Sequence, residues 1–146
     1  MIATLNYFFY VFYLTVPVAT ATSSCANLLV HQTTTSGIIQ TGGTTPSGEY
    51  SRYADNVDCR WNISSNAMLE LEFLRFKTVD HNDYLRVYDG GSPTAPLIGT
   101  YSGSFLPATV TSTSNKLYMR FISDASSVSY GFVARYQGKM LIEYIV

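Results

Sequence analysis

Short segments in which apolar and polar residues alternate constrain the fold of this chain more than any other feature. Residues 69–73 have the sequence Leu-Glu-Leu-Glu-Phe, the pattern of a strand with one buried and one solvent-exposed face. Phe76 falls outside this alternation and predicts a bulge near the end of the strand. Comparable patterns predict further strands at 28–30, 59–63, 84–88, 117–121 and 132–136.

Turn-forming residues separate these segments and favour an all-β fold. The stretch from His31 to Gly48 is rich in Thr, Ser and Gly and predicts a loop or an edge strand. The 12 Tyr and 8 Phe residues suit strands, and no helix or internal repeat is indicated after the N-terminal segment. We therefore expect one domain, built as a two-sheet antiparallel β-sandwich.

The overall charge gives no indication of a strongly anionic partner. The formal net charge is -1 at pH 7, so neither nucleic acid nor an anionic membrane surface is expected to bind. The charges are unevenly distributed along the chain, because no Lys, Arg, Asp or Glu precedes Glu49.

The N-terminal segment predicts a cleaved signal peptide. An unbroken apolar and aromatic run extends from Tyr7 to Leu14, and Ala19-Thr20-Ala21 supplies the small-x-small pattern that signal peptidase recognises. The run is too short to span a bilayer comfortably, and Pro17 would break a helix. No Lys or Arg precedes the run, and a buried N-terminal strand is the alternative interpretation. We expect residues 1–21 to be a signal peptide and the mature protein to be secreted.

The two cysteines, Cys25 and Cys59, predict one disulfide bond if the chain is secreted, because an isolated pair in an oxidising compartment usually forms one. The bond would close a loop of roughly 34 residues and contribute roughly 3–4 kcal/mol on a chain-entropy basis. Two free thiols or an intermolecular bridge are the alternatives. A zinc site is not indicated, since His31 and His81 lack metal-ligand spacing relative to the cysteines.

A catalytic constellation is not apparent, so we do not expect an enzyme. The two histidines fall in polar segments, and no serine has the Gly-x-Ser-x-Gly context of a nucleophile elbow. His81 is close in sequence to Asp80 and Asp83, but a solvated loop explains this grouping.

Two longer stretches, 83–91 and 121–132, carry a resemblance to a known family. The first is an alternating strand that ends at Asp-Gly, and the second is a strand that stops at Ser-Asp and restarts after a glycine. Together with Cys25, the Gly37-Ile38-Ile39 stretch, Tyr53 and the Cys59-Arg60-Trp61 segment, they resemble the CUB domain, an extracellular β-sandwich module with a spermadhesin-like jelly-roll fold.

The resemblance runs from Cys25 to Tyr136 and implies a domain organisation and a function. With the expected signal peptide at 1–21, it implies a CUB domain at 22–136 and a C-terminal tail at 137–146. The implied function is non-catalytic binding of an extracellular protein or glycan. The alternative is a non-catalytic CUB fragment of a larger secreted multidomain protein, such as a protease or a receptor.

The resemblance also implies a calcium site, although one ligand is missing. Many CUB domains hold Ca²⁺ with a strand-opening Asp, matched here by Asp83, and with an Asp-x-Ser loop, matched by Asp124 and Ser126. Tyr53 matches the residue that supports these ligands.

The expected Glu ligand of that site falls on Val79, and Asp80 is the neighbouring carboxylate that would have to replace it. This loss makes any Ca²⁺ binding weak. The alternative interpretation is that Asp83 and Asp124 cap strands and accept backbone hydrogen bonds. In the family this acidic edge often receives a Lys or Arg side chain of a partner.

Two further features follow from the comparison with the family pattern and from a sequon. A second disulfide common in CUB domains is missing here, because its positions fall in the 80–82 loop and at Ser102. The Asn62-Ile63-Ser64 sequon predicts N-glycosylation of Asn62.

Overall fold

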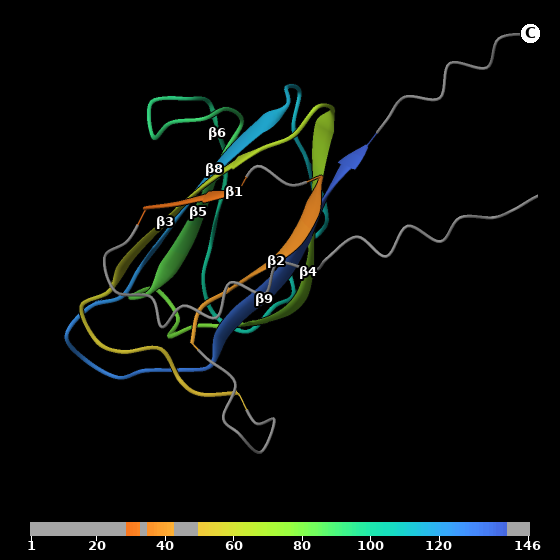
Figure 1. The fold of residues 1–146 in the computed structure, drawn as a ribbon. Helices are drawn as coiled ribbons and strands as arrows, with labels where there is room; N and C mark the ends of the chain where they lie inside the picture. The colour runs from red at the N-terminus through yellow and green to blue at the C-terminus, as the bar shows by residue number, and fades with distance from the viewer. Residues whose placement is uncertain (1–28, 33–34, 43–49, 140–146) are drawn as a thin grey trace, which may run out of the picture.

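The computed structural model describes residues 29–32, 35–42 and 50–139, which form strands and loops and no helix (Figure 1). The strands are β1 (Leu29–Gln32), β2 (Ser36–Gln40), β3 (Asp58–Ser64), β4 (Met68–Lys77), β5 (Tyr84–Tyr88), β6 (Leu97–Tyr101), β7 (Val110–Thr111), β8 (Lys116–Ile122) and β9 (Gly131–Lys139). The expected signal peptide, residues 1–21, and Cys25 lie outside the described residues. No helix suited to crossing a membrane occurs in the described part of the chain.

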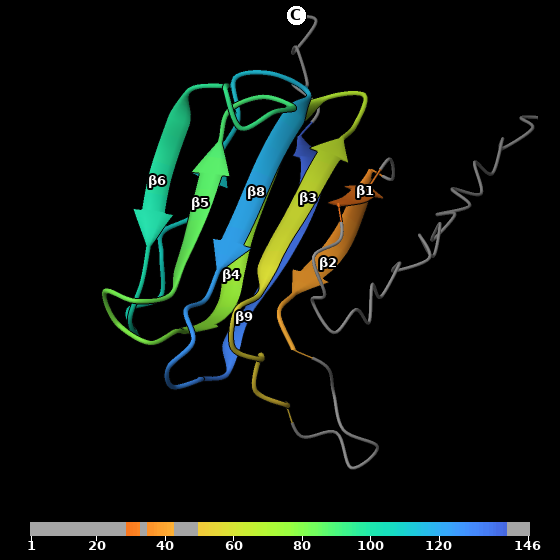
Figure 2. The same cartoon turned by 90° about the vertical axis from the view of Figure 1, so that its left-hand side faces the viewer.

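The strands form two sheets that pack face to face. One sheet has five strands in the order β1-β3-β8-β5-β6, and the other has four in the order β2-β9-β4-β7. In Figure 2 the five-stranded sheet lies in front of the four-stranded one. Neighbouring strands are antiparallel except for β1 and β3, which are parallel. The prediction of a two-sheet antiparallel sandwich is therefore confirmed.

The core lies between the sheets and is made by the apolar residues of the alternating segments. In β4 the burial alternates as predicted, with Leu69 and Leu71 fully buried between half-buried Glu residues. Aromatic residues fill the centre of the sandwich, where the ring centroids of Trp61 and Phe132 are 5.6 Å apart and edge-to-face. Burying each large apolar side chain contributes about 1.5–3 kcal/mol, which makes this core the main source of stability.

The predicted irregularity at the end of β4 is present. The pairing of β4 with β9 shifts register between Phe73 and Arg75, which is a β-bulge. Leu74 is consequently 48% exposed, whereas Phe76 returns to the core at 5% exposure. The bulge turns the last residues of β4 so that Arg75 and Lys77 are both exposed.

Some strands were not predicted, or were predicted only in part. The alternation that indicates a half-buried strand is missing from β6, where Leu97 and Ile98 are both exposed, and β7 is too short to show a pattern. The stretch predicted as a loop or edge contains β2, which is an edge strand of the four-stranded sheet. Residues 137–139, which were expected in the C-terminal tail, belong to β9.

Several connections meet at one end of the sandwich, which we call the loop end. They are the β4–β5 (78–83), β6–β7 (102–109) and β8–β9 (123–130) connections, together with residues 50–57 before β3. Backbone hydrogen bonds tie them to one another, from Thr78 to Gly103 (2.8 Å), from Tyr53 to Ser129 (3.2 Å) and from Asn56 to Asp124 (2.8 Å). Figure 2 shows these connections at the bottom of the view. The predicted site residues Tyr53, Asp80, Asp83, Asp124 and Ser126 all lie here.

Candidate functional site

Asp83, the residue immediately before β5, is a buried carboxylate at the loop end. Its exposure is 0%. The hydroxyl group of Tyr53 donates a 2.5 Å hydrogen bond to Oδ2, and the backbone N–H of Asp124 donates one of 2.9 Å to Oδ1. Both oxygens therefore accept hydrogen bonds from connections that are distant in the sequence, so Asp83 joins three loops.

Tyr53 supports this arrangement from the segment before β3. Its ring packs edge-on against Phe121, with centroids 4.9 Å apart. Its hydroxyl oxygen also accepts a 3.0 Å hydrogen bond from the backbone N–H of Val79. Burial, and then the hydrogen bond to Asp83, raises the pKa of Tyr53 above its usual value. The hydroxyl group therefore stays protonated and acts as a donor throughout the physiological pH range.

Asp124 accepts hydrogen bonds from neutral donors in two loops. Nδ2 of Asn82 donates to Oδ2 over 2.6 Å, and the backbone N–H of Ser126 donates to Oδ1 over 2.8 Å. The Ser126 hydroxyl lies 3.1 and 3.2 Å from the two oxygens. The hydrogen bond from Asn82, followed by the one from the Ser126 backbone, lowers the pKa of Asp124. The β8–β9 loop is thus fastened to the β4–β5 loop without a charged partner.

Asp80 has a different environment from the other two aspartates. Its side chain is 65% exposed, and its Oδ1 lies 3.0 Å from Nδ1 of His81. It stands against the β6–β7 connection, since a Cβ built on Gly103 would be 3.1 Å from the same oxygen. His81 has a φ of 62°, a left-handed conformation that is unfavourable for a residue with a side chain.

The donor set at the loop end does not fit a resident Ca²⁺ ion. Calcium takes roughly six to eight oxygen ligands, typically with several carboxylates. All four oxygens of Asp83 and Asp124 already accept hydrogen bonds. Val79 provides no third carboxylate, and Asp80 faces His81. Across the described ranges, no three His, Cys, Asp or Glu side chains are grouped so that they could hold a metal ion.

Ser102 fastens the β4–β5 loop at the place where the resemblance indicates a missing disulfide. Its hydroxyl group accepts a 2.9 Å hydrogen bond from the backbone N–H of His81. The same hydroxyl group can donate to the carbonyl oxygen of Asp83, at 2.9 Å, and to that of Val79, at 3.2 Å. Hydrogen bonds from one serine therefore connect the end of β6 with the loop.

Sequence reasoning missed two residues that organise the loop end. Asn82 was assigned only to a polar loop, yet it bridges to Asp124. Ser123 accepts a 3.0 Å hydrogen bond from the Val57 backbone and donates one of 2.9 Å to the Ala54 carbonyl. No local signal identifies such partners, because they are more than 40 residues apart in the sequence.

A separate ion cluster lies on the five-stranded sheet and was also not anticipated. Arg60 on β3 and Arg120 on β8 are directly paired across the two strands. Asp58 receives two hydrogen bonds from each, with nitrogen–oxygen distances between 2.5 and 3.1 Å. The hydrogen bonds from Arg120, then from Arg60, lower the pKa of Asp58. The carboxylate thus offsets the repulsion between two opposed guanidinium groups.

The predicted disulfide and glycosylation positions are only partly described. Cys59 is buried at 2% exposure in β3, and the described residues include no free cysteine. Its expected partner, Cys25, lies outside the described residues, so the bridge stays a prediction. Asn62 is half-buried in the same strand and donates a 2.7 Å hydrogen bond to the carbonyl oxygen of Gly91. Glycosylation of Asn62 also stays a prediction.

The β6–β7 connection exposes two large apolar side chains. Phe105 is 90% exposed and Leu106 is 58% exposed. They follow Gly103, whose N–H donates a 2.9 Å hydrogen bond to Oγ1 of Thr78 at the end of β4. Exposed aromatic and aliphatic side chains grouped on one connection are typical of interaction surfaces.

Comparisons with known proteins agree with this architecture. The family model of the CUB domain matches residues 33–136. Cubilin from Rattus norvegicus is 38% identical over 95 residues, which cover 60% of this chain and 3% of cubilin. Tolloid-like protein 2 from Mus musculus is 38% identical over 89 residues, which cover 57% of this chain and 9% of that protein. The chain therefore spans only a small part of the length of these relatives.

Solved structures support the same fold. The MASP-1 CUB2 domain, solved bound to Ca²⁺, superposes with a TM-score of 0.61 at 23% identity and covers 78% of this chain and 100% of that domain. The extracellular region of zebrafish Gpr126/Adgrg6 superposes with a TM-score of 0.63 at 24% identity, covering 82% of this chain and 15% of that region. From the family match and the shared sandwich, the chain belongs to the CUB domain family.

Proposed function

We propose that this CUB domain is a secreted, non-catalytic module that binds an extracellular protein through its loop end. The observation that supports the proposal is the exposure of Phe105 and Leu106 on the connection whose Gly103 lies against the exposed side chain of Asp80. A protruding aromatic side chain can enter a pocket of a partner, while neighbouring charges select the partner's orientation.

The charges of this surface favour a partner segment that carries Lys or Arg next to an apolar residue. Asp80 and Asp124 are the carboxylates that such a segment can reach, because Asp83 has no exposed surface. We assign Asp83 and Tyr53 the role of holding the three loops in position. The partner's cation would replace the neutral donors that Asp124 now uses, Asn82 and Ser126.

We further propose that partner binding at this surface does not require calcium. The MASP-1 CUB2 domain was solved bound to Ca²⁺. In the present chain the third carboxylate is replaced by Val79, and Asn82 supplies a hydrogen bond that joins the same loops. Asp83, Asp124, Ser126 and Asp80 would then bind Ca²⁺ only weakly, if the ion displaced these hydrogen bonds.

The length of the relatives favours an alternative setting for the same role. Cubilin and Tolloid-like protein 2 are many times longer than the matched segment. The domain would then be a binding module within a larger secreted protein, such as a protease or a receptor. Sequencing the native transcript beyond the codon for Val146 distinguishes this alternative from a free-standing module.

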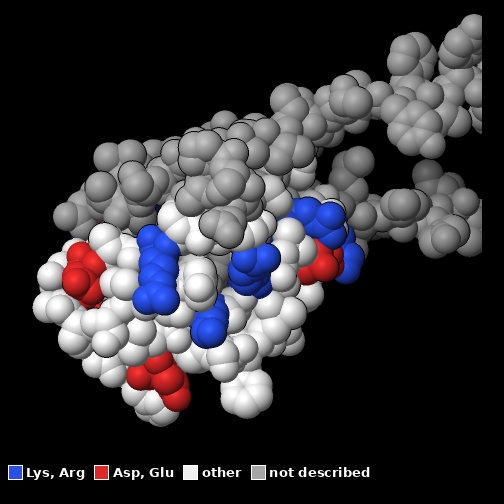
Figure 3. All heavy atoms as spheres, turned by 90° about the horizontal axis from the view of Figure 1, so that it is seen from below, with Lys and Arg blue, Asp and Glu red and all other residues white. Residues whose placement is uncertain are grey.

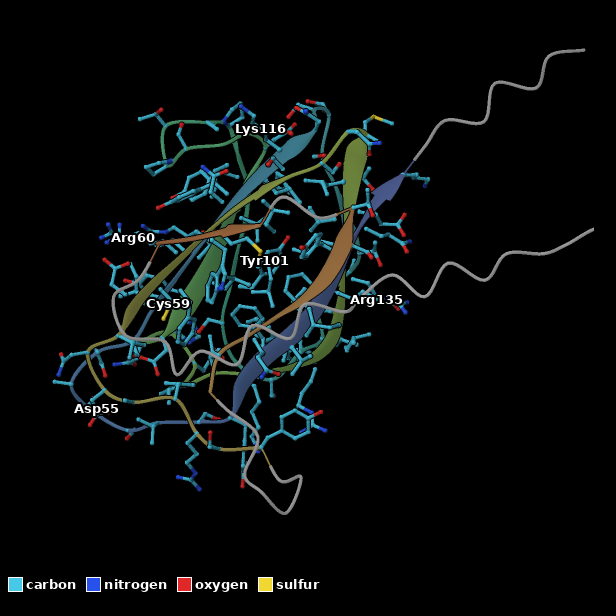
Figure 4. The ribbon with its side chains drawn as sticks, in the orientation of Figure 1. Asp55, Cys59, Arg60, Tyr101, Lys116 and Arg135 are labelled. Carbon is cyan, nitrogen blue, oxygen red and sulfur yellow. The ribbon has the colours of Figure 1, made fainter. Side chains whose placement is uncertain are left out.

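The proposal can be tested by presenting the secreted protein to an array of extracellular proteins and glycans in calcium-free buffer. We expect binders that are lost in Phe105→Ser and weakened in the double variant Asp80→Asn/Asp124→Asn. Lys116→Gln, which changes one charge at the opposite end of the sandwich, serves as the control (Figure 4). Binders that tolerate all loop-end changes would place the interaction on another surface and contradict the proposal.

A further inference from the structure

The cationic side chains of this domain fall into two groups, one with carboxylate partners and one without. Of the nine Lys and Arg residues, Arg60, Arg120, Arg135 and Lys139 form ion pairs with carboxylates. The described residues offer no ion-pair partner to the others, which are Arg52, Arg75, Lys77, Arg86 and Lys116. Three of these, Arg52, Arg75 and Lys77, are exposed and come together through two tyrosine rings.

The tyrosines hold these three charges in fixed positions. The guanidinium group of Arg75 lies 3.7 Å from the centre of the Tyr50 ring. The Tyr130 ring has Arg52 at 5.5 Å and Lys77 at 5.7 Å from its centre. Cation–π contacts of this kind position a charge while leaving its N–H groups free to donate to a ligand. We call these five residues the basic surface.

The fold explains why the basic surface forms at this place. After the bulge in β4, Arg75 and Lys77 both point outward from the four-stranded sheet, where Lys77 pairs with Gly131, next to Tyr130. Tyr53, next to Arg52, is bonded through its N–H to Ser129.

Viewed from below, Lys and Arg side chains gather near the middle of the face, and most Asp and Glu side chains lie farther out (Figure 3). Asp55, Glu72 and Asp80 are the described acidic residues within three positions of its cations, and none of them is within ion-pair distance of those cations. Glu72 pairs with Arg135 instead.

We propose that the basic surface binds a sulfated polysaccharide. Closely spaced like charges repel one another, and a bound polyanion would relieve this repulsion. Guanidinium groups match the oxygen geometry of sulfate, and a linear chain with repeated sulfates can contact charges that are spread over a surface instead of gathered in a pocket.

The composition of the basic surface argues against a lipid bilayer as its ligand. Proteins that lie on membranes insert several apolar side chains beside their basic residues, whereas the five residues of this surface are cations and tyrosines, and the exposed apolar side chain next to them in β4 is Leu74. The inference is independent of the protein-binding surface proposed above, which consists of Phe105, Leu106, Asp80 and Asp124. Loss of binding at one surface therefore leaves the other testable.

The test measures binding of a heparin-derived decasaccharide to the secreted full chain by surface plasmon resonance at physiological salt. We expect the double variant Arg75→Gln/Lys77→Gln to bind at least about tenfold more weakly, since each charge-assisted contact is among the stronger hydrogen bonds. The slope of log affinity against log salt should fall by about two, as for other polyanions. Lys116→Gln, which removes a charge at the other end of the sandwich, should change the affinity less than about twofold.

Separate arms of the same experiment distinguish a sulfated polysaccharide from other anionic ligands. Chemically desulfated heparin and poly-glutamate should both bind much more weakly than heparin. Phosphatidylserine vesicles should not compete with the decasaccharide. Equal binding by the double variant, an equal loss in Lys116→Gln, or stronger binding to vesicles or poly-glutamate than to heparin would each overturn the proposal. Unchanged melting temperatures would show that the variants are folded.

Discussion

The hydroxyl group of Tyr53 donates a 2.5 Å hydrogen bond to Oδ2 of Asp83, a carboxylate with no exposed surface. The same hydroxyl oxygen accepts a hydrogen bond from the Val79 backbone. Removing it would leave a buried acceptor and a backbone donor each short of one partner. The Tyr53–Asp83 pair thus links the segment before β3 to the segment before β5.

The variant Tyr53→Phe should lower the free energy of unfolding by about 1–3 kcal/mol, the usual cost of an unsatisfied buried polar group. Urea denaturation followed by fluorescence measures this change. Tyr84→Phe on β5 is the matched control, because Tyr84 is half-buried and its ring contact with Arg86 does not involve the hydroxyl group. Equal stability of the two variants would show that the Tyr53 hydroxyl group does not hold the loops.

Calcium should leave the stability of the domain almost unchanged. A ligand that binds only the folded state stabilises it by mass action, and a dissociation constant above about 100 mM would add only ~0.1 kcal/mol at 20 mM Ca²⁺. Because Val79 removes one carboxylate from the site, we expect a shift of less than ~1 °C in melting temperature up to 20 mM Ca²⁺. A larger rise that magnesium does not reproduce, and that Asp124→Ala abolishes, would contradict this expectation.

The stability of the domain in acid should depend on Asp58. Its pKa is lowered by Arg120 and Arg60, so the unfolded chain takes up the proton at a higher pH than the folded one. The contribution of Asp58 is therefore complete above its ordinary pKa of about 4 and is lost as the pH falls below that value.

The variant Asp58→Asn should lower stability by about 1 kcal/mol near neutral pH and flatten the acid side of the stability–pH profile. Thermal melting between pH 2 and pH 7 measures both effects. Asp55→Asn, at an exposed position without an ion pair among the described residues, is the control and should leave the profile unchanged. A stability–pH profile of Asp58→Asn that runs parallel to that of the unchanged protein would refute this role of Asp58.

Cys25 and Cys59 should be linked within one chain in the secreted protein. Such a bridge would tie the N-terminal segment to β3, whose Cys59 is buried beside the core. Reduction should then destabilise the domain by about 2–4 kcal/mol. Peptide mapping under non-reducing conditions detects the linkage directly. Recovery of both cysteines as free thiols, or of a dimer joined by them, would contradict the prediction.

The sequence predicted the sandwich because its strands carry their own signal. Alternating residues such as those of 69–73 require one buried face, and Phe76 marked the bulge that the structure contains. The strand β6 was missed because its sequence, Leu-Ile-Gly-Thr-Tyr, does not alternate between apolar and polar residues, so its place in the sheet depends on pairing with β5.

The candidate site was predicted less completely, for the same physical reason. Tyr53, Asp83 and Asp124 were expected to lie together, and the structure joins them by hydrogen bonds. The role of Asn82 depends on a contact across 42 positions, which no local pattern encodes. The overall charge concealed the basic surface as well, because the carboxylates that balance the total lie elsewhere on the sandwich.

Ser102 holds the β4–β5 loop by hydrogen bonds, which differ from a covalent crosslink in how they can be broken. Hydrogen bonds from its hydroxyl group break and reform by thermal motion, with no change in oxidation state. A disulfide at this place would open only when a reductant reached it. Displacing the left-handed His81 and the Asn82 contact to Asp124 would therefore need no change in oxidation state. Opening the loop end to a partner would then need neither a reductant nor an enzyme.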